Sequence, residues 1–220
     1  MTTVAAVRSA AVASPARRAR RTGAGSGMIR MLDIALALSA ILLVAPTLAL
    51  IALAVRLQDG GPVLFRQVRI GRGGVAFHCL KFRTMTPDAE ARLPAMQDSE
   101  WRASRKFRRD PRVTRLGRLL RVSSLDELPQ LLNVLRGDMS MVGPRPIVFD
   151  EASLYGRRLA DYCAVRPGLT GLWQVAGRND VPYPRRVAMD VWLARNRSLG
   201  VYLLILARTV PAVLSRRGVY

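Results

Sequence analysis

Residues 31–57 read MLDIALALSAILLVAPTLALIALAVRL, a stretch that is apolar almost throughout. As one helix, about 25 apolar residues match the ~30 Å hydrocarbon core of a bilayer. A helix that is apolar on every side would be unusual inside a soluble protein of this size. A cleavable secretory signal is disfavoured, because its apolar part normally covers about 7–15 residues. The stretch therefore predicts a membrane helix.

Pro46 lies at the middle of this run. Proline removes a backbone donor and clashes with the carbonyl four residues earlier, so we expect the helix to kink there. The two halves, roughly 22 and 18 Å long, would each be too short to cross the bilayer. One prediction is a re-entrant helix that is broken at Pro46 and returns to the same face, and the other is a kinked spanning helix. Basic residues flank both ends of the run and give no preferred direction of crossing; they are Arg17, Arg18, Arg20, Arg21, Arg30, Arg56, Arg66, Arg69 and Arg72.

The chain as a whole is strongly basic. Its 220 residues include 35 Lys and Arg but only 15 Asp and Glu, a formal charge of +20, which favours an anionic partner such as acidic lipid or nucleic acid. Residues 1–30 hold six arginines, no acid and no apolar period, so we predict a disordered basic tail. Cys79 and Cys163 form no CxxC pair and His78 is the only histidine, so a disulfide framework, a zinc cluster and an imidazole-based triad are all disfavoured.

Residues 58–220 are enough for one domain with its own core. Two apolar, β-branched runs joined by GRGG at residues 71–74 predict a β-hairpin. Residues 150–164 and 184–193 are predicted to be helices, and RPGLTGLWQVAGRND at 166–180 a glycine-rich loop. The C-terminal residues 198–217 predict an interfacial amphipathic helix. The predicted fold class is α+β and mainly helical: a small β-hairpin or sheet, a re-entrant N-terminal membrane helix and interfacial amphipathic helices.

Asp126 and Glu127 lie side by side in RVSSLDELPQLLNVLRGDMSMVGPRP, residues 121–146. One interpretation is a capping box, in which Ser124 and Glu127 begin a helix. Pro129 argues against it, because proline is best placed at the first helical position and would begin the helix after the pair. In either register both carboxylates lie at a helix N-terminus, where the dipole and nearby arginines lower the pKa. We therefore expect an ionised Asp126 that is able to attack phosphorus.

Basic side chains at short range would suit a phosphoanhydride. Arginine binds phosphate oxygens in a bidentate fork, whereas lysine acts as a point charge. Pro144 and Pro146 fix the backbone on both sides of Arg145, which lowers the entropy lost when that side chain binds. Taken singly, each basic residue could equally be a solvated surface charge. The candidates are Lys81 and Arg83 in LKFRTM, Arg121, Arg145, Arg166, and Arg178 in AGRND.

Four motifs in this order resemble those of one known family, the bacterial sugar transferases or monotopic phosphoglycosyl transferases. They are the apolar run with its central proline, KFRTM at residues 81–85, SLDELPQLLNVLRGDMSMVGPRP at 124–146 and RPGLTGLWQVAGRN at 166–179. The family transfers a phosphosugar from a UDP-sugar to undecaprenyl (polyprenol) phosphate and releases UMP. The resemblance implies that residues 58–220 form a catalytic domain on the cytoplasmic face of the inner membrane. It also implies a role in starting the assembly of an exopolysaccharide or another glycoconjugate.

The resemblance also implies roles for single residues. Asp126 would attack the β-phosphate of the UDP-sugar and hold the phosphosugar covalently, while Glu127 would act as a base or orient a metal. Mg²⁺ would bind at Asp126 and neutralise phosphate charge. The sequence GLWQVAGR is more similar to that of relatives that transfer hexose 1-phosphates, such as those of glucose or galactose, than to that of relatives that transfer phosphates of N-acetylated sugars. Substrate binding would involve Lys81, Arg83, Arg121, Pro144, Arg145, Pro146 and Arg178.

Two points leave alternatives open. The family commonly places Ser before the break proline, whereas Ala45 precedes Pro46 here, so Thr47 or Ser39 would have to satisfy the freed backbone. The charge would also fit a nucleic-acid-binding protein, or a basic membrane-associated protein without catalysis. Residues 101–121 carry nine basic residues against a single acid, Asp110, and few of them are aromatic. Because the Asp-Glu pair is also intact, we expect an enzyme, a tail that binds anionic lipid and no nucleic acid. A homodimer is left open.

Overall fold

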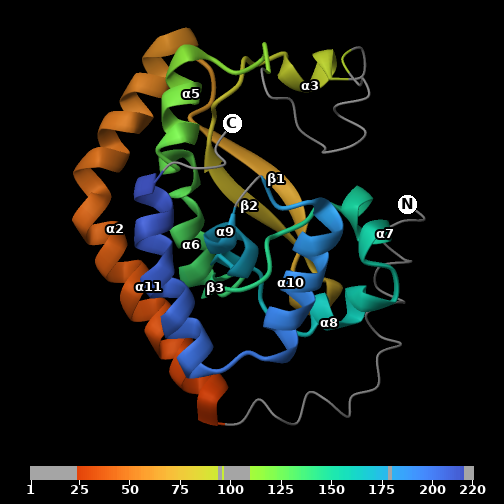
Figure 1. The fold of residues 1–220 in the computed structure, drawn as a ribbon. Helices are drawn as coiled ribbons and strands as arrows, with labels where there is room; N and C mark the ends of the chain where they lie inside the picture. The colour runs from red at the N-terminus through yellow and green to blue at the C-terminus, as the bar shows by residue number, and fades with distance from the viewer. Residues whose placement is uncertain (1–23, 94–95, 97–109, 178–179, 216–220) are drawn as a thin grey trace.

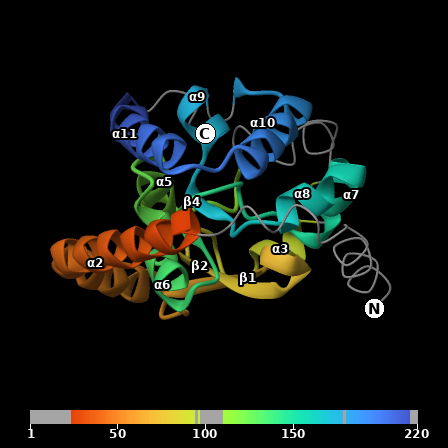
Figure 2. The same ribbon diagram turned by 90° about the horizontal axis from the view of Figure 1, so that it is seen from below.

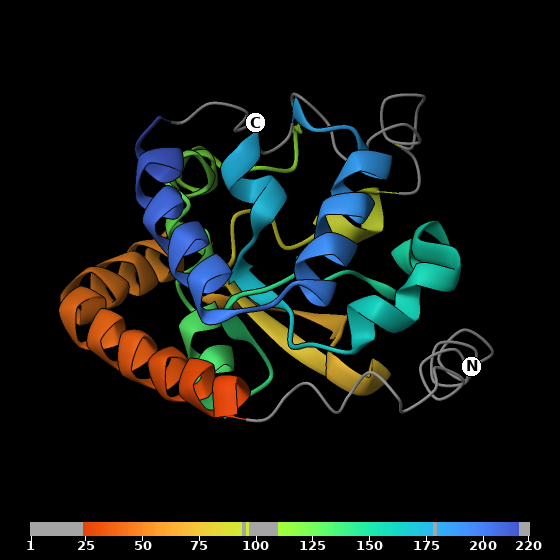
Figure 3. The ribbon, with the colours of Figure 1, turned by 60° about the horizontal axis from the view of Figure 1, so that its bottom comes forward.

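The computed structural model describes residues 24–93, 96, 110–177 and 180–215, and most of them are helical. Helix α2 (Ala24–Asp59) runs along one side of the molecule with α11 (Leu199–Ser215) beside it (Figure 1). Two small sheets lie at the centre, with α9, α10 and α11 on one side and α2 and α6 on the other (Figures 2 and 3). The α+β, mainly helical part of the fold prediction is thus confirmed.

The elements other than α2 and α11 are short. The strands are β1 (Leu64–Ile70), β2 (Ala76–Phe82), β3 (Ser140–Val142) and β4 (Gly168–Thr170). The α-helices are α3 (Ala89–Arg92), α5 (Arg115–Val122), α6 (Gln130–Arg136), α7 (Ala152–Tyr155), α8 (Leu159–Cys163), α9 (Leu172–Ala176) and α10 (Tyr183–Arg195). The 3₁₀ turns are η2 (Arg72–Gly74), η4 (Leu125–Glu127), η5 (Phe149–Glu151) and η6 (Gly156–Arg158).

Helix α2 is continuous for 36 residues with Pro46 in its interior. The helix is bent near its middle (Figure 1), so the expected kink is present while the two halves remain one helix. At 1.5 Å per residue it is about 54 Å long, more than the ~30 Å core. Within the described part of the chain, residues 26–59 form the one helix long and apolar enough to cross a membrane. Leu42, Leu43 and Leu50 are exposed on it, as lipid contact would require.

The helix begins seven residues earlier than residue 31. Residues 24–30, which the composition assigned to a disordered tail, are helical. Ile29 is buried, and the Arg30 guanidinium donates to the carbonyls of Val134 (2.6 Å) and Leu135 (2.9 Å) at the end of α6. These distant contacts extend the helix, and local composition could not reveal them. The rest of the predicted tail, residues 1–23, lies outside the described residues.

The predicted β-hairpin is confirmed. Strands β1 and β2 pair antiparallel, with Leu64 opposite Phe82 and Ile70 opposite Ala76. At the turn, Gly73 (φ 71°) and Gly74 (φ 73°) adopt left-handed backbone conformations that residues other than glycine rarely take. The glycine-rich sequence therefore serves the turn.

Two predictions downstream were wrong. Residues 150–164 form four short pieces instead of one helix, and Gly156 (φ 50°) interrupts them with a conformation that a regular helix cannot hold. Residues 166–180, expected as a loop, contain strand β4 and helix α9. Strand β4 pairs in parallel with β3, so its partner comes from a distant motif that local sequence does not indicate.

Candidate active site

The carboxylate pair lies in η4, between α5 and α6. Ser124 adopts a left-handed conformation (φ 58°) and its side chain makes no capping hydrogen bond, so the capping-box interpretation was wrong. Pro129 instead takes the position just before α6, and that helix begins after the pair, as the proline alternative predicted. Asp126 and Glu127 are therefore not used to cap a helix.

Asp126 is buried, with 7% of its surface exposed. Burial is the largest effect on its carboxyl and raises the pKa to about 6; Glu127 also raises it, while Lys81 and Arg121 lower it. The expectation of a lowered pKa for Asp126 was wrong, because desolvation outweighs the effects of Lys81 and Arg121. The carboxylate that forms near neutral pH is poorly solvated and more basic than that of an ordinary aspartate.

Lys81 and Glu127 form an ion pair across the site. Lys81 Nζ on β2 lies 2.5 Å from Glu127 Oε1, and both side chains are partly exposed. Arg121 on α5 donates from Nε to the Thr84 hydroxyl at 2.9 Å, which holds its guanidinium in place. Burial lowers the pKa of Arg121, and the nearby Asp126 opposes this effect. Opposite charges are thus concentrated around Asp126.

A small pocket, partly open to solvent, adjoins the ion pair. It brings together four residues selected from the sequence, Lys81, Glu127, Arg145 and Pro146. Its other lining residues are Arg69, Cys79, Gln130, Gly168, Leu169 and Gln174. Its ionic groups are mainly cationic, which suits phosphate. Asp126 is not among the residues that line it.

The Pro144-Arg145-Pro146 segment is held by backbone contacts on several sides. Gly168 N–H donates to the Pro144 carbonyl at 2.8 Å, and Arg69 Nη1 donates to the Pro146 carbonyl at 2.9 Å. The Arg145 N–H donates to Asp190 at 3.3 Å, and the Arg145 guanidinium lies 5.9 Å from the Trp173 ring centroid. The prolines therefore belong to a rigid support for Arg145.

Comparison with known proteins gives the site its context. Residues 25–216 match the family model described as bacterial sugar transferase. The chain belongs to the bacterial sugar transferase family. This sugar transferase is 49% identical over 197 residues to the exopolysaccharide production protein ExoY of Rhizobium meliloti (strain 1021), covering 87% of each chain.

Two further relatives carry more specific names. The UDP-glucose:undecaprenyl-phosphate glucose-1-phosphate transferase of Caulobacter vibrioides is 45% identical over 199 residues, covering 87% of this sugar transferase and 71% of the relative. The undecaprenyl-phosphate galactose phosphotransferase of Salmonella typhimurium is 47% identical over 169 residues, covering 74% of this sugar transferase and 36% of the relative. The sugar transferase is thus an enzyme of the phosphoglycosyl transferase type.

Not every predicted substrate-binding residue of the sugar transferase lies at the pocket. Arg83 is buried and pairs with Asp59 at the end of α2, so it connects the domain to the long helix. Arg166 donates to the Gly137 carbonyl at 2.8 Å. Arg121 lies near Asp126 but does not line the pocket. Arg178 lies outside the described residues.

Sequence reasoning missed Arg69 and the two glutamines of the pocket. A usable signal existed for Arg69, because paired residues of an antiparallel hairpin share a face and side chains alternate along each strand. Phe65 pairs with Lys81 and Gln67 with Cys79, so Arg69 extends the same face toward the pocket. For Gln130 and Gln174 we find no comparable signal.

The carboxylate pair suits Mg²⁺ only as a partial ligand set. No group of three or more His, Cys, Asp and Glu that could hold a metal occurs in the described ranges. Mg²⁺ usually takes one or two carboxylates and completes its shell with phosphate oxygens and water. Asp126 and Glu127 fit that pattern if the substrate supplies the remaining ligands.

Proposed function

We propose that this sugar transferase moves a sugar 1-phosphate from a UDP-sugar to undecaprenyl phosphate and releases UMP. The observation that carries the proposal is a buried, basic carboxylate at Asp126 beside an ion pair and a cationic pocket. The names of the Caulobacter and Salmonella relatives support the same reaction.

The proposed reaction has two displacements at one phosphorus. An Asp126 oxygen attacks the β-phosphorus, and the bond to the bridging oxygen breaks as UMP leaves with the electron pair. A phosphate oxygen of undecaprenyl phosphate then attacks the same phosphorus, and the Asp126 carboxylate is the leaving group. The two-step route avoids bringing two anionic substrates together. Because Asp126 is buried, substrate binding has to open a path to its carboxylate.

The other groups would stabilise charge. Lys81 and Arg145 would bind phosphate oxygens, and Arg121 would stay close to the reacting carboxylate. Mg²⁺, held by Asp126 with Glu127 nearby, would supply neutralisation of the diphosphate charge. Chelation by EDTA should then stop UMP release, and added Mg²⁺ should restore it.

The deciding experiment is to trap the covalent intermediate. Membranes containing the full chain are incubated with UDP-glucose or UDP-galactose, without acceptor, and peptides are examined by mass spectrometry. We expect a hexose phosphate on Asp126, its absence in Asp126→Asn, and slower but detectable loading in Glu127→Gln. An adduct at another residue would reject the assignment, and loading from an N-acetylated donor alone would reject the hexose preference.

We further propose that α2 is a re-entrant membrane helix that places the domain at the cytoplasmic face of the inner membrane, near anionic lipid. The exposed leucines and the bend at Pro46 support this proposal. Topology reporters fused ahead of residue 24 and after residue 220 should both report the cytoplasm. Signals from opposite sides would identify a spanning helix instead.

A further inference from the structure

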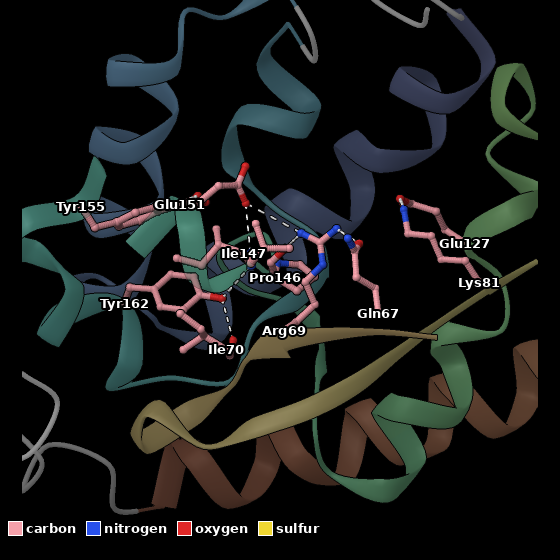
Figure 4. Close-up of polar contacts among 12 residues, drawn as sticks. Gln67, Arg69, Ile70, Lys81, Glu127, Pro146, Ile147, Glu151, Tyr155 and Tyr162 are labelled. Atoms are coloured by element: carbon pink, nitrogen blue, oxygen red, sulfur yellow. Dashed lines mark hydrogen bonds and ion pairs between the residues drawn. The ribbon is translucent and has the colours of Figure 1, made fainter. Parts of the chain in front are cut away.

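Arg69 places a buried guanidinium in the wall of the pocket. Arg69 lies on β1, and its side chain is 10% exposed. Nη1 donates to the Pro146 carbonyl at 2.9 Å, and Nη2 donates to the Gln67 side chain (Figure 4). Its Nε is buried without a hydrogen-bond partner in the described part of the structure. Arg69 thus has donor capacity that the protein leaves unused.

The positive charge of Arg69 is also poorly neutralised. Its paired carboxylate, Glu151, lies 3.8 Å away, beyond normal hydrogen-bonding distance. The same Glu151 oxygen accepts the Val148 N–H at 3.1 Å. Burial lowers the pKa of Arg69, and the nearby Arg145 lowers it further. Arg69 and Arg145 line the same pocket, and two cations placed there favour an anion bound beside them.

We infer that Arg69 binds a substrate phosphate and forms, with Arg145, a two-guanidinium subsite in the same pocket as the Lys81–Glu127 pair. Figure 4 shows that Arg69 and this pair lie apart, so the pocket has two separate charged positions. A planar guanidinium can keep one donor on the Pro146 carbonyl and direct others to phosphate oxygens. The inference rests on the proposed function and names a residue that it requires.

The phosphate could belong to the donor diphosphate or to the lipid acceptor. The two half-reactions separate these sources. Donor binding is measured as UMP release from UDP-glucose or UDP-galactose without acceptor. Acceptor binding is measured as transfer from preloaded enzyme to undecaprenyl phosphate. A defect in the first, the second or both assigns the phosphate to the donor, the acceptor or both.

The test compares Arg69→Gln with Arg66→Gln in the full chain in membranes. Arg66 is an exposed residue of the same strand, so its variant removes an equal charge outside the pocket. Losing a charge-assisted hydrogen bond predicts a roughly 10- to 100-fold fall in kcat/KM for Arg69→Gln in at least one half-reaction. Arg66→Gln should stay within about twofold of the parent.

A purely structural role is distinguished by inhibitor binding. If the donor diphosphate is bound, Arg69→Gln should weaken inhibition by UDP and leave inhibition by uridine unchanged. A damaged fold would weaken both. Arg69→Lys is the second variant. It keeps the positive charge but lacks the planar guanidinium that binds phosphate in a bidentate manner, so we expect a normal melting temperature and a smaller loss of kcat/KM than in Arg69→Gln.

The inference is overturned if Arg69→Gln matches Arg66→Gln in both half-reactions. It is also overturned if Arg69→Gln weakens inhibition by UDP and inhibition by uridine to the same extent. It is also overturned if Arg69→Gln does not accumulate and Arg69→Lys has parental kinetics. If the parent releases no UMP from either sugar nucleotide, the proposed function fails. UDP and uridine binding, measured by thermal shift, then still test the phosphate subsite.

Discussion

At the scale of single residues, burial of the ionised Asp126 carboxyl lowers the stability of the folded protein but makes the carboxylate a better nucleophile. Burial makes the charged form costly, and the same loss of solvation leaves the carboxylate basic and reactive. Lys81 and Arg121 offset part of that cost. A nucleophile made in this way should be visible both in the pH profile and in the stability of a neutral variant.

The pH dependence of UMP release should report Asp126. Protonation of Asp126 would block both its attack on phosphorus and its binding of Mg²⁺, so at limiting Mg²⁺ kcat/KM should rise through pH about 6 and level off above it. Lys81→Met should move the midpoint up, because the ammonium lowers the pKa, and Glu127→Gln should move it down, because the carboxylate raises it. The check is to measure the rate of UMP release by the parent and by both variants from pH 5 to 8. Shifts in the same direction would contradict this account.

Asp126→Asn should stabilise the substrate-free protein at pH 7.5. The pKa is raised from 3.8 to about 6, so the destabilisation is present above pH 6 and is lost as pH falls toward the unfolded value near 4. A shift of this size corresponds to about 3 kcal/mol at most. Thermal melting in detergent should therefore show a higher Tm for the variant at pH 7.5 and a smaller difference at pH 5. An unchanged or lower Tm at pH 7.5 would count against the raised pKa.

At the scale of elements, strand β4 is held so close to the Pro-Arg-Pro segment that no side chain fits between them. A Cβ built on Gly168 would lie 2.0 Å from the Gly143 nitrogen, and one on Gly143 would lie 2.5 Å from the Arg166 carbonyl oxygen. These contacts join the third and fourth motifs. They explain why glycine stands at both positions.

Gly168→Ala should separate β4 from β3 and displace Arg145. Forcing a methyl group into such a contact typically costs about 1–3 kcal/mol, so we expect a lower Tm and a large loss of UMP release. Gly200→Ala is the matched control, because a Cβ there meets nothing within 4 Å and Gly200 lies in α11. That variant should be neutral or slightly stabilising. Equal effects of both substitutions would show that the close contact is unimportant.

At the scale of the whole molecule, Asp33 attaches the membrane helix to the domain. It is fully buried, and its Oδ1 accepts hydrogen bonds from the Ser140 hydroxyl (2.9 Å), the Met141 N–H (2.8 Å) and the Tyr202 hydroxyl (2.9 Å). One carboxylate thus connects α2, β3 and α11. This is why the apolar run contains an acid at all.

Asp33→Ala should weaken the docking of α2. It leaves several buried donors without their acceptor, and hydrogen bonds to charged groups are each worth about 1.5–3 kcal/mol. Detergent-solubilised protein should melt several degrees lower and be cleaved faster by protease near residues 60–63. Leu43→Ala, at a position of the same helix that is 82% exposed, should behave like the parent. A parental melting curve for Asp33→Ala would show that α2 is docked by apolar contacts alone.

Sequence reasoning predicted the parts that depend on short-range pattern. Two apolar, β-branched runs joined by a glycine-rich turn predicted the β1–β2 hairpin. The position of Pro129 predicted that α6 begins after the carboxylate pair. Lys81, Glu127, Arg145 and Pro146 were selected from motifs and do line one pocket. Arg83 was selected in the same way, but it pairs with Asp59, a contact between residues 24 positions apart that no motif encodes.

The sequence by itself determined an apolar helix with a proline at its middle and a β-hairpin, because these follow from composition, periodicity and local spacing. Its four ordered motifs carried the resemblance to the sugar transferase family. Only the tertiary structure decided which charges are desolvated and which side chains meet. It reversed the expected pKa of Asp126, placed Arg69 in the pocket and gave Asp33 its partners. The physical reason is that burial and charge–charge distance are set by segments far apart in the chain.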